Sequence, residues 1–278
     1  YVMNGVKVGI IGIGNMGSAH LRMITGGNIP DMTVTAVCDI NPERLKAAKA
    51  EYPDIAAFGD YTELLKSSDN DAVIIAVPHP LHAKIAIEAF EYGKHVLVEK
   101  PMDITVSAAE KLCAAARKSG KVFAVMFNQR TNGLFREARR IVNSGELGEL
   151  KRSVWIITNW YRTQSYYDSG SWRATWRGEG GGVLLNQAPH NLDIWQWICG
   201  KPSAVTAFCN VGKFHNIEVE DEATIYTENE NGETGVFITS TGDCPGTNRL
   251  EITGTRGKIV LENGLLKLWK VKEDERDI

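Results

Sequence analysis

A glycine motif near the start of the chain has the spacing that lets a backbone loop hold a dinucleotide. Three glycines form the pattern G-x-G-x-x-G, directly after an apolar run at 6–11 and at the start of a helical pattern. The first glycine permits a tight turn, the second lets the backbone approach a pyrophosphate, and the third allows a helix to pack closely on a strand. Free N–H groups at the helix N-terminus attract the anion. We therefore expect a dinucleotide to contact Gly12, Gly14, Asn15, Met16 and Gly17.

An acidic residue, Asp39, closes the second apolar run at 34–38. A carboxylate at this position can accept hydrogen bonds from the adenosine ribose hydroxyls, and it would repel a 2′-phosphate. The sequence therefore favours NAD over NADP. Arg44 lies five residues further on and could partly offset that repulsion, so NADP stays possible.

Lys100 is a candidate for the chemistry itself. It follows the apolar run at 96–98 in the segment Glu99-Lys100-Pro101. Ligands of parallel sheets bind outside the carboxyl ends of the strands, so a lysine there would face the nicotinamide region. A solvated surface lysine is the alternative. Pro101 favours a functional role, because a proline restricts the preceding residue to an extended conformation.

A second candidate group follows a triple glycine at 180–182. In a helix from about 185 to 198, Asn186, His190 and Asp193 stand at i, i+4 and i+7 and share one face. Pro189 is tolerable in such a helix only near its start. A single histidine is usually structural, but three polar groups on one stripe after a glycine run indicate a site.

The elements that must position these residues change character near residue 127. Before it, short apolar runs alternate with helical patterns, which predicts an α/β domain with a doubly wound parallel Rossmann sheet at 1–127. After it, we expect an α+β domain at 128–278, with helices at about 133–144 and 185–198 and a largely antiparallel sheet. The expected strands of that sheet are 153–160, 205–212, 223–228, 234–240, 249–254, 258–261 and 265–270.

Composition narrows the kind of partner. The net charge is −3, and acids and bases are mixed along the chain without a basic cluster, which argues against nucleic acid and a membrane surface. The five cysteines form no CxxC pair, so we expect reduced thiols and no metal site. No apolar run approaches the ~18 residues of a membrane span. A cytoplasmic protein with a small-molecule substrate is expected.

Taken together, these segments resemble the Gfo/Idh/MocA family, the glucose–fructose oxidoreductase and inositol dehydrogenase group. The matching pieces are the glycine loop, residues 76–82, residues 93–101, and the triple glycine followed by His190 and Asp193. The resemblance implies a second domain with an open-faced sheet that often mediates dimers or tetramers. It also implies NAD(P)-dependent oxidation or reduction of sugars, cyclitols or related polyols.

The resemblance also implies roles for individual residues. Lys100 would hydrogen-bond the reacting oxygen, and its peptide bond to Pro101 is often cis in the family. His190 would act as general acid/base, taking the hydroxyl proton as hydride leaves for nicotinamide C4, which suits an imidazole near neutral pH. The remaining cofactor contacts would come from Ala76, Pro78, His79, His82 and Glu99, and from Lys100 itself.

Three departures from the family pattern stand out. Most members have an aspartate four residues before the histidine, where this chain has Asn186, so His190 and Lys100 must share the acid/base work. His79 replaces a common asparagine. Relatives usually continue for many tens of residues beyond the position of Ile278, so we expect the family's closing segment to be missing from this chain.

Aromatic and basic residues crowd the stretch between the two candidate segments. Aromatic platforms with interspersed arginines suit a polyhydroxylated ring, including one that bears an acidic group, although domain core or subunit interface is an equal alternative for any single residue. The predicted substrate contacts are Asn128, Arg130, Trp160, Arg162, Tyr166, Trp172 and Arg173, together with Asn186 and His190.

The sequence thus predicts an NAD-dependent dehydrogenase or reductase that acts on a CH–OH group of a sugar-like molecule, as a homodimer or homotetramer. Two alternatives on the same fold stay open. One is a regulator that binds the cofactor without catalysis. The other is an enzyme that uses NAD transiently to cleave glycosides, by oxidising C3 and then eliminating.

Overall fold

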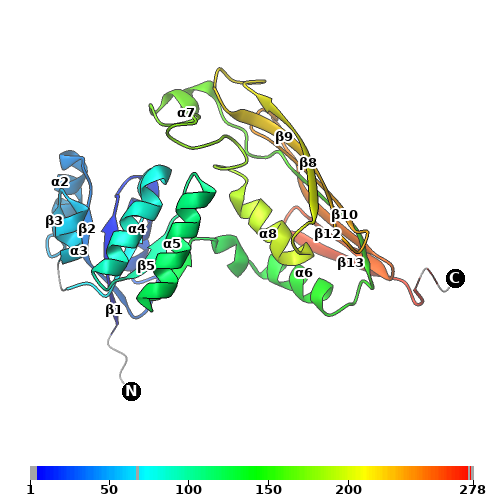
Figure 1. Ribbon diagram of the computed structural model, residues 1–278, viewed down its shortest axis with the longest axis horizontal. Coiled ribbons are helices and arrows are strands. Elements are labelled where there is room, and N and C mark those ends of the chain that lie inside the picture. The colour runs from blue at the N-terminus through cyan, green and yellow to red at the C-terminus, as the bar shows by residue number, and fades with distance from the viewer. Residues whose placement is uncertain (1–4, 67–68, 275, 277–278) are drawn as a thin grey trace. The chain divides into compact units, whose positions relative to one another are not determined.

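The computed structural model describes residues 5–66, 69–274 and 276. The chain divides into two compact units, an N-terminal unit of residues 1–126 and a C-terminal unit of residues 127–278 (Figure 1). Among the helices of the described residues, none is both long and apolar enough to cross a membrane.

The N-terminal unit is built on a six-stranded parallel sheet in the order β3-β2-β1-β4-β5-β6. This is the predicted doubly wound sheet, and its strand order reverses direction between β1 and β4, where such sheets bind ligands. The strands are β1 (Val6–Ile11), β2 (Met32–Cys38), β3 (Ala56–Phe58), β4 (Ala72–Ile75), β5 (His95–Val98) and β6 (Phe123–Val125).

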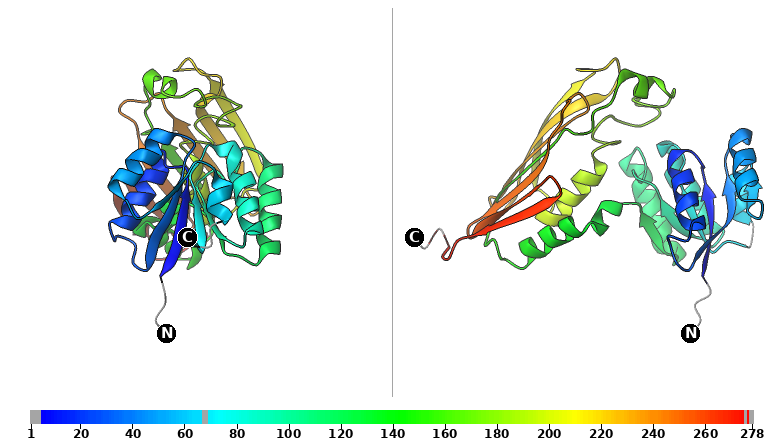
Figure 2. Two further views of the ribbon diagram at one scale, coloured as in Figure 1. Left: turned by 90° about the vertical axis from the view of Figure 1, so that its left-hand side faces the viewer. Right: turned by 180° about the vertical axis from the view of Figure 1, so that it is seen from behind.

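Helices cover both faces of this sheet (Figure 2). One apolar core packs the sheet against the first two helices, and a second core packs it against the last three α-helices. Local chemistry sets the ends of these helices: Asn41 and Thr105 accept hydrogen bonds from backbone N–H groups as N-caps, and Gly120 ends a helix with φ +64°. The helices are α1 (Asn15–Thr25), α2 (Pro42–Glu51), α3 (Tyr61–Lys66), the 3₁₀ turn η1 (His79–Leu81), α4 (His82–Glu91) and α5 (Val106–Ser119).

The C-terminal unit contains a seven-stranded sheet in the order β13-β12-β11-β7-β10-β9-β8. Every neighbouring pair is antiparallel except β7 and β10, which run parallel. The prediction of a largely antiparallel sheet is confirmed. Its strands are β7 (Leu150–Ile157), β8 (Ala204–Val211), β9 (Glu220–Glu228), β10 (Thr234–Ser240), β11 (Asn248–Gly254), β12 (Gly257–Glu262) and β13 (Leu265–Lys270).

Helices lie on one face of this sheet, and in the described part of the chain none covers the other face (Figure 1). Trp155, Phe237 and Ile252 alternate inward from three strands and are fully buried beneath α6 and α8. The opposite, open face carries the intervening residues, such as Val154 and Val236, which pair across β7 and β10. The helical elements are η2 (Asn128–Thr131), α6 (Gly133–Asn143), α7 (Gln164–Asp168) and α8 (Pro189–Cys199).

The strand expected at 153–160 lies at Leu150–Ile157, and the predicted start of the last helix is also wrong. Helix α8 begins at Pro189 rather than near residue 185, because proline has no N–H to donate and is best accommodated in the first turn of a helix. The residues just before it form turns instead: the Asn186 N–H donates to the Gly182 carbonyl (2.9 Å), and the Ala188 N–H donates to the Val183 carbonyl (2.8 Å).

Candidate active site

The glycine loop between β1 and α1 is shaped as the motif predicts. A side chain at Gly12, where φ is +87°, would place its Cβ 2.5 Å from the carbonyl oxygen of Ala76, and one at Gly17 would lie 1.8 Å from the carbonyl oxygen of Gly12. Gly14 differs, because its Cβ would meet only the Arg44 Nη1 at 3.8 Å. Gly12 and Gly17 are therefore needed for packing, and Gly14 offers open space where a pyrophosphate can approach the backbone.

Asp39 fixes this loop at the end of β2. Its buried carboxylate accepts hydrogen bonds from the N–H groups of Ile13 (2.9 Å) and Asn41 (2.8 Å). Arg44 Nη1 lies 3.3 Å from the Asp39 Oδ2. A carboxylate has about four lone-pair positions, so these contacts leave capacity for ribose hydroxyls. Asp39, which is predicted to favour NAD, and Arg44, which is predicted to offset its charge, thus both lie at the loop.

We expect Asp39→Ser to lower kcat/KM for NAD by about 10- to 100-fold, since hydrogen bonds to a charged group contribute roughly 1.5–3 kcal/mol. The same variant should use NADP better than the native chain does, because the repulsion of the 2′-phosphate is removed and Arg44 remains. Steady-state kinetics with both cofactors measure this. In Asp39→Ser/Arg44→Ala the gain with NADP should vanish. A single variant that still rejects NADP would contradict the assignment.

The carboxyl end of β5 carries the predicted Glu99-Lys100-Pro101 segment, with a cis peptide bond between Lys100 and Pro101. Glu99 is buried, and its Oε1 lies 2.7 Å from the His20 Nε2. Its Oε2 accepts the backbone N–H of Lys100 at 3.3 Å. Burial alone would raise the pKa of Glu99, but the hydrogen bond and charge of His20 and the Lys100 N–H outweigh it, and the pKa is lowered. Glu99 is therefore ionised beside the lysine.

His82 ties the loops after β4 and β5 together. Its ring nitrogens lie 2.7 Å from the Pro101 carbonyl oxygen and 2.8 Å from that of Val77, and burial lowers its pKa. A neutral imidazole has one N–H, so it donates to one of these carbonyls at a time. The ring of His79, also buried, lies 5.8 Å away between centroids. His82 thus contacts backbone carbonyl oxygens in the two loops that contain predicted site residues.

In the C-terminal unit, the triple glycine allows its backbone to pack closely against the start of β9. A Cβ at Gly182 would lie 1.8 Å from the carbonyl oxygen of Glu220 on β9. The Glu220 side chain accepts the N–H groups of Gly182 (2.9 Å) and Leu184 (3.0 Å). These hydrogen bonds hold the turn before α8 against the sheet, and they thereby position the start of α8.

His190 lies in the first turn of α8 and contacts the ring of Phe127 edge-on, with 6.0 Å between centroids. Asn186 lies in the preceding turn, so the prediction that it shares a helical face with His190 and Asp193 is wrong. Its side-chain amide instead donates to the carboxylate of Glu179. The Asp193 side chain is bound in a bidentate pair by Arg130 (2.5 and 2.8 Å).

The predicted substrate contacts separate into two groups. Arg130, on η2 beside the exposed Asn128, attaches that turn to α8 through Asp193, and this hydrogen bond raises its pKa. The other group forms a continuous stack in which arginines alternate with aromatic rings at 4.6 to 6.0 Å from guanidinium to ring centroid. Its members, in order, are Trp160, Arg162, Tyr166, Arg173 and Trp172.

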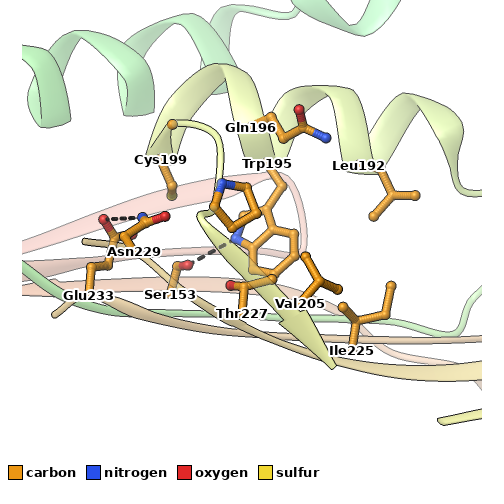
Figure 3. Close-up of a pocket in the computed structure, with 12 residues that line it drawn as sticks. Ser153, Leu192, Trp195, Gln196, Cys199, Val205, Ile225, Thr227, Asn229 and Glu233 are labelled. Atoms are coloured by element: carbon orange, nitrogen blue, oxygen red, sulfur yellow. Dashed lines mark hydrogen bonds between the residues drawn. The ribbon is translucent and has the colours of Figure 1, made fainter. Parts of the chain in front are cut away.

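A pocket of about 190 Å³ lies under the C-terminal half of α8 (Figure 3). His190, at the N-terminal end of the same helix, does not line this pocket. Trp195 donates its indole N–H to Ser153 across it (2.9 Å). At one end Glu233, only 4% exposed, accepts a hydrogen bond from the Asn229 side chain at 3.1 Å. Burial raises the pKa of Glu233 more than this hydrogen bond lowers it.

We expect Glu233→Gln to stabilise the protein at mildly alkaline pH relative to its effect at acidic pH, because burial raises the pKa of Glu233. The folded state binds the Glu233 proton more tightly than the unfolded state. Stability from this group is therefore full at acidic pH and is lost as the pH rises from the unfolded-state pKa to the raised folded-state pKa. Chemical denaturation across pH measures this, with exposed Glu230→Gln as the control. A destabilisation that is equal at every pH would contradict it.

Sequence reasoning missed three residues that organise these sites. His20 partners Glu99 across 79 positions of sequence, and Glu220 partners Gly182 across 38. Glu179 lies beside the triple glycine, which is the one local signal that any of them offers. The others are ordinary polar residues of a helix and a strand until the fold is known.

Two family models together match most of the chain. The model GFO_IDH_MocA, described as an oxidoreductase family with an NAD-binding Rossmann fold, matches residues 6–127, and the GFO/IDH/MocA C-terminal domain matches residues 135–260. The chain belongs to the Gfo/Idh/MocA family. It is therefore an NAD-binding oxidoreductase by family, and the predicted resemblance, fold and cofactor are confirmed.

Individual relatives agree with this membership. The chain is 30% identical over 265 residues to the uncharacterized oxidoreductase YrbE of Bacillus subtilis, which covers 93% of this chain and 74% of YrbE. It is 34% identical to inositol 2-dehydrogenase of Salmonella typhimurium over 52% of this chain and 43% of that enzyme. Among solved structures, the WlbA dehydrogenase of Bordetella pertussis in complex with NADH and UDP-GlcNAcA superposes with a TM-score of 0.89, at 26% identity over 98% of this chain and 84% of that one.

Proposed function

We propose that the protein transfers a hydride between NAD and a secondary hydroxyl, or the corresponding carbonyl, of a sugar-like polyol. The placement of Lys100 carries this proposal. In the strand order of the N-terminal unit, β1, β4 and β5 are neighbours, so the glycine loop and Lys100 leave the same carboxyl edge of one sheet. A cation at that edge is suited to the oxygen of a reacting C–OH group. In this proposal residues 1–127 bind the cofactor and residues 128–278 bind the substrate.

Bound NAD would supply the hydride acceptor at its nicotinamide ring, held by the glycine loop, Asp39 and Glu99, with residues 76, 78, 79 and 82 shaping the adjoining loop. The ammonium of Lys100 stabilises the negative charge that develops on the substrate oxygen. The imidazole of His190 accepts the hydroxyl proton in oxidation and returns it in reduction. Asn186 hydrogen-bonds a neighbouring hydroxyl of the substrate, and its amide cannot take up a proton, so the proton transfer falls to His190.

The arginine–aromatic stack supports a substrate that bears an anionic group. Arg173 donates to the Tyr166 hydroxyl (2.9 Å), and the guanidiniums of Arg162 and Arg173 lie 5.0 and 4.6 Å from the centroid of the Tyr166 ring. In the described part of the chain, the Trp160 Nε1 and the Arg162 Nε are buried N–H donors without a hydrogen-bond partner. Such donors suit substrate hydroxyls and a carboxylate or phosphate. The acidic nucleotide sugar bound by the WlbA structure has this chemistry.

We further propose a cytoplasmic homodimer or homotetramer that pairs through the open face of the C-terminal sheet. Phe208 of β8 and Tyr226 of β9 stand on that face, and both are exposed, Phe208 by 72%. Large exposed apolar side chains on one face indicate an interaction surface. Sedimentation of the native chain and of a Phe208→Glu variant tests this assembly.

The test of function is a screen of sugars, cyclitols and free or nucleotide-linked sugar acids with NAD and NADP, read by NADH absorbance. Turnover of at least one polyol, fastest with an acidic sugar, is expected. Cofactor binding without turnover of any member would instead identify a non-catalytic regulator. Release of an aglycone from glycosides without net NADH would identify glycoside cleavage.

A further inference from the structure

Glu179 is a buried carboxylate next to the proposed site that the chemistry above leaves unused. Glu179 is only 1% exposed to solvent. One carboxylate oxygen accepts the side-chain amide of Asn186, and the other accepts the backbone N–H of Ala174 at 2.7 Å. A buried carboxylate persists when it is hydrogen-bonded in this way. The glutamate thus holds two separate segments of the C-terminal unit.

The contact with Glu179 sets the orientation of the Asn186 amide. An ionised carboxylate only accepts hydrogen bonds, so the group that faces it must be the NH₂ of Asn186 and not its carbonyl. The carbonyl oxygen of Asn186 then lies on the opposite side of the amide and is the atom that can accept a hydrogen bond from a hydroxyl. Without the glutamate, the amide could present either atom.

The second contact links Glu179 to the arginine–aromatic stack. Ala174 adopts a left-handed backbone conformation, with φ +50°, directly after Arg173. Arg173 stacks on Tyr166 and Trp172 at 4.6 and 4.8 Å from their centroids. One side chain therefore fixes both the loop that carries the stack and the amide beside His190.

We propose that Glu179 is a positioning residue that makes Asn186 a fixed, neutral hydrogen-bond acceptor for a substrate hydroxyl next to the reacting one. The amide of this pair faces the substrate, and the carboxylate stays on the buried partner. The Asn186 carbonyl oxygen orients the substrate through this neighbouring hydroxyl, and the reacting hydroxyl gives its single proton to His190. This inference rests on the proposed function.

The test is a cycle of Glu179→Gln, Asn186→Asp and the double variant, which exchanges the acid and the amide. Glu179→Gln releases the amide, so kcat should fall about 10-fold while the KM for NAD stays within about 2-fold. Asn186→Asp places two carboxylates in contact, so it should lose about 100-fold in kcat and lower Tm. The double variant restores one acceptor–donor pair and should exceed both single variants in kcat and recover Tm. Exposed Gln196→Glu on α8 is the charge control and should match the native chain.

Two readouts separate the possible failures. If the native chain turns over no polyol, the proposed function fails, and the Tm cycle still reports whether residues 179 and 186 are coupled as described. If the native chain is active and Glu179→Gln keeps native kcat, or the double variant is no better than Asn186→Asp, the positioning role of Glu179 is overturned.

Discussion

Replacing Lys100 with alanine should lower kcat by about 10²- to 10³-fold, with NAD binding changed little. The loss corresponds to the removal of one preorganised donor from the oxygen on which charge develops, and such donors act mainly in the transition state. We expect dinucleotide affinity to come chiefly from the glycine loop and from Asp39, which accepts the N–H of Ile13 in that loop. Steady-state kinetics and NADH fluorescence titration separate the two effects.

Two further variants sharpen the Lys100 experiment. Lys100→Arg keeps the charge but replaces a compact ammonium with a planar fork, so we expect only partial recovery. Lys84→Ala removes an exposed lysine of α4 and should leave kcat unchanged. Full activity in Lys100→Ala would remove the lysine from the mechanism and with it the main support for the proposed reaction.

Replacing His190 with alanine should cost about 10²- to 10⁴-fold in kcat, the usual contribution of a positioned acid or base. Oxidation requires the imidazole without its second proton, so native activity should decline towards acidic pH. That acidic limb should disappear from the residual activity of the variant. Because the contact with the ring of Phe127 is an edge contact at a helix start, we expect the fold to persist.

Added imidazole gives an independent check on His190. If the lost group is a proton acceptor, free imidazole should restore part of the oxidation rate of His190→Ala and none of that of Lys100→Ala. The matched control is His95→Ala, a half-buried histidine on β5. Unchanged turnover in His190→Ala, or equal rescue of both catalytic variants, would contradict its role as acid/base.

The features of the fold that are determined by residues close together in the sequence could be predicted. The strands around the glycine loop, the acid at the end of β2 and the change of architecture near residue 127 follow from runs of apolar residues and from turn chemistry. Contacts between residues that lie far apart in the sequence could not be predicted. Nothing local indicates that His20 contacts Glu99, or that Glu220 fastens Gly182.

The start of α8 shows how local patterns can mislead. The spacing of Asn186, His190 and Asp193 fits a helix. Only the preference of proline for the first turn of a helix indicates that the helix begins between Asn186 and His190. In the structure two of these polar groups have different partners, because Asn186 contacts Glu179 and Asp193 contacts Arg130. The predicted helical stripe therefore combines residues that make two separate contacts in the structure.

The order of strands in the C-terminal sheet has an evolutionary consequence. The chain leaves β7 at residue 157 and rejoins the sheet in β8 at residue 204, on the far side of β9 and β10. The intervening residues add no strand, yet they contain the arginine–aromatic stack, Glu179, Asn186 and His190. The proposed substrate contacts other than Asn128 and Arg130 thus lie in one contiguous segment, and substitutions there leave the hydrogen-bonded ladder of strands unchanged. Libraries for altered specificity should be confined to residues 158–203.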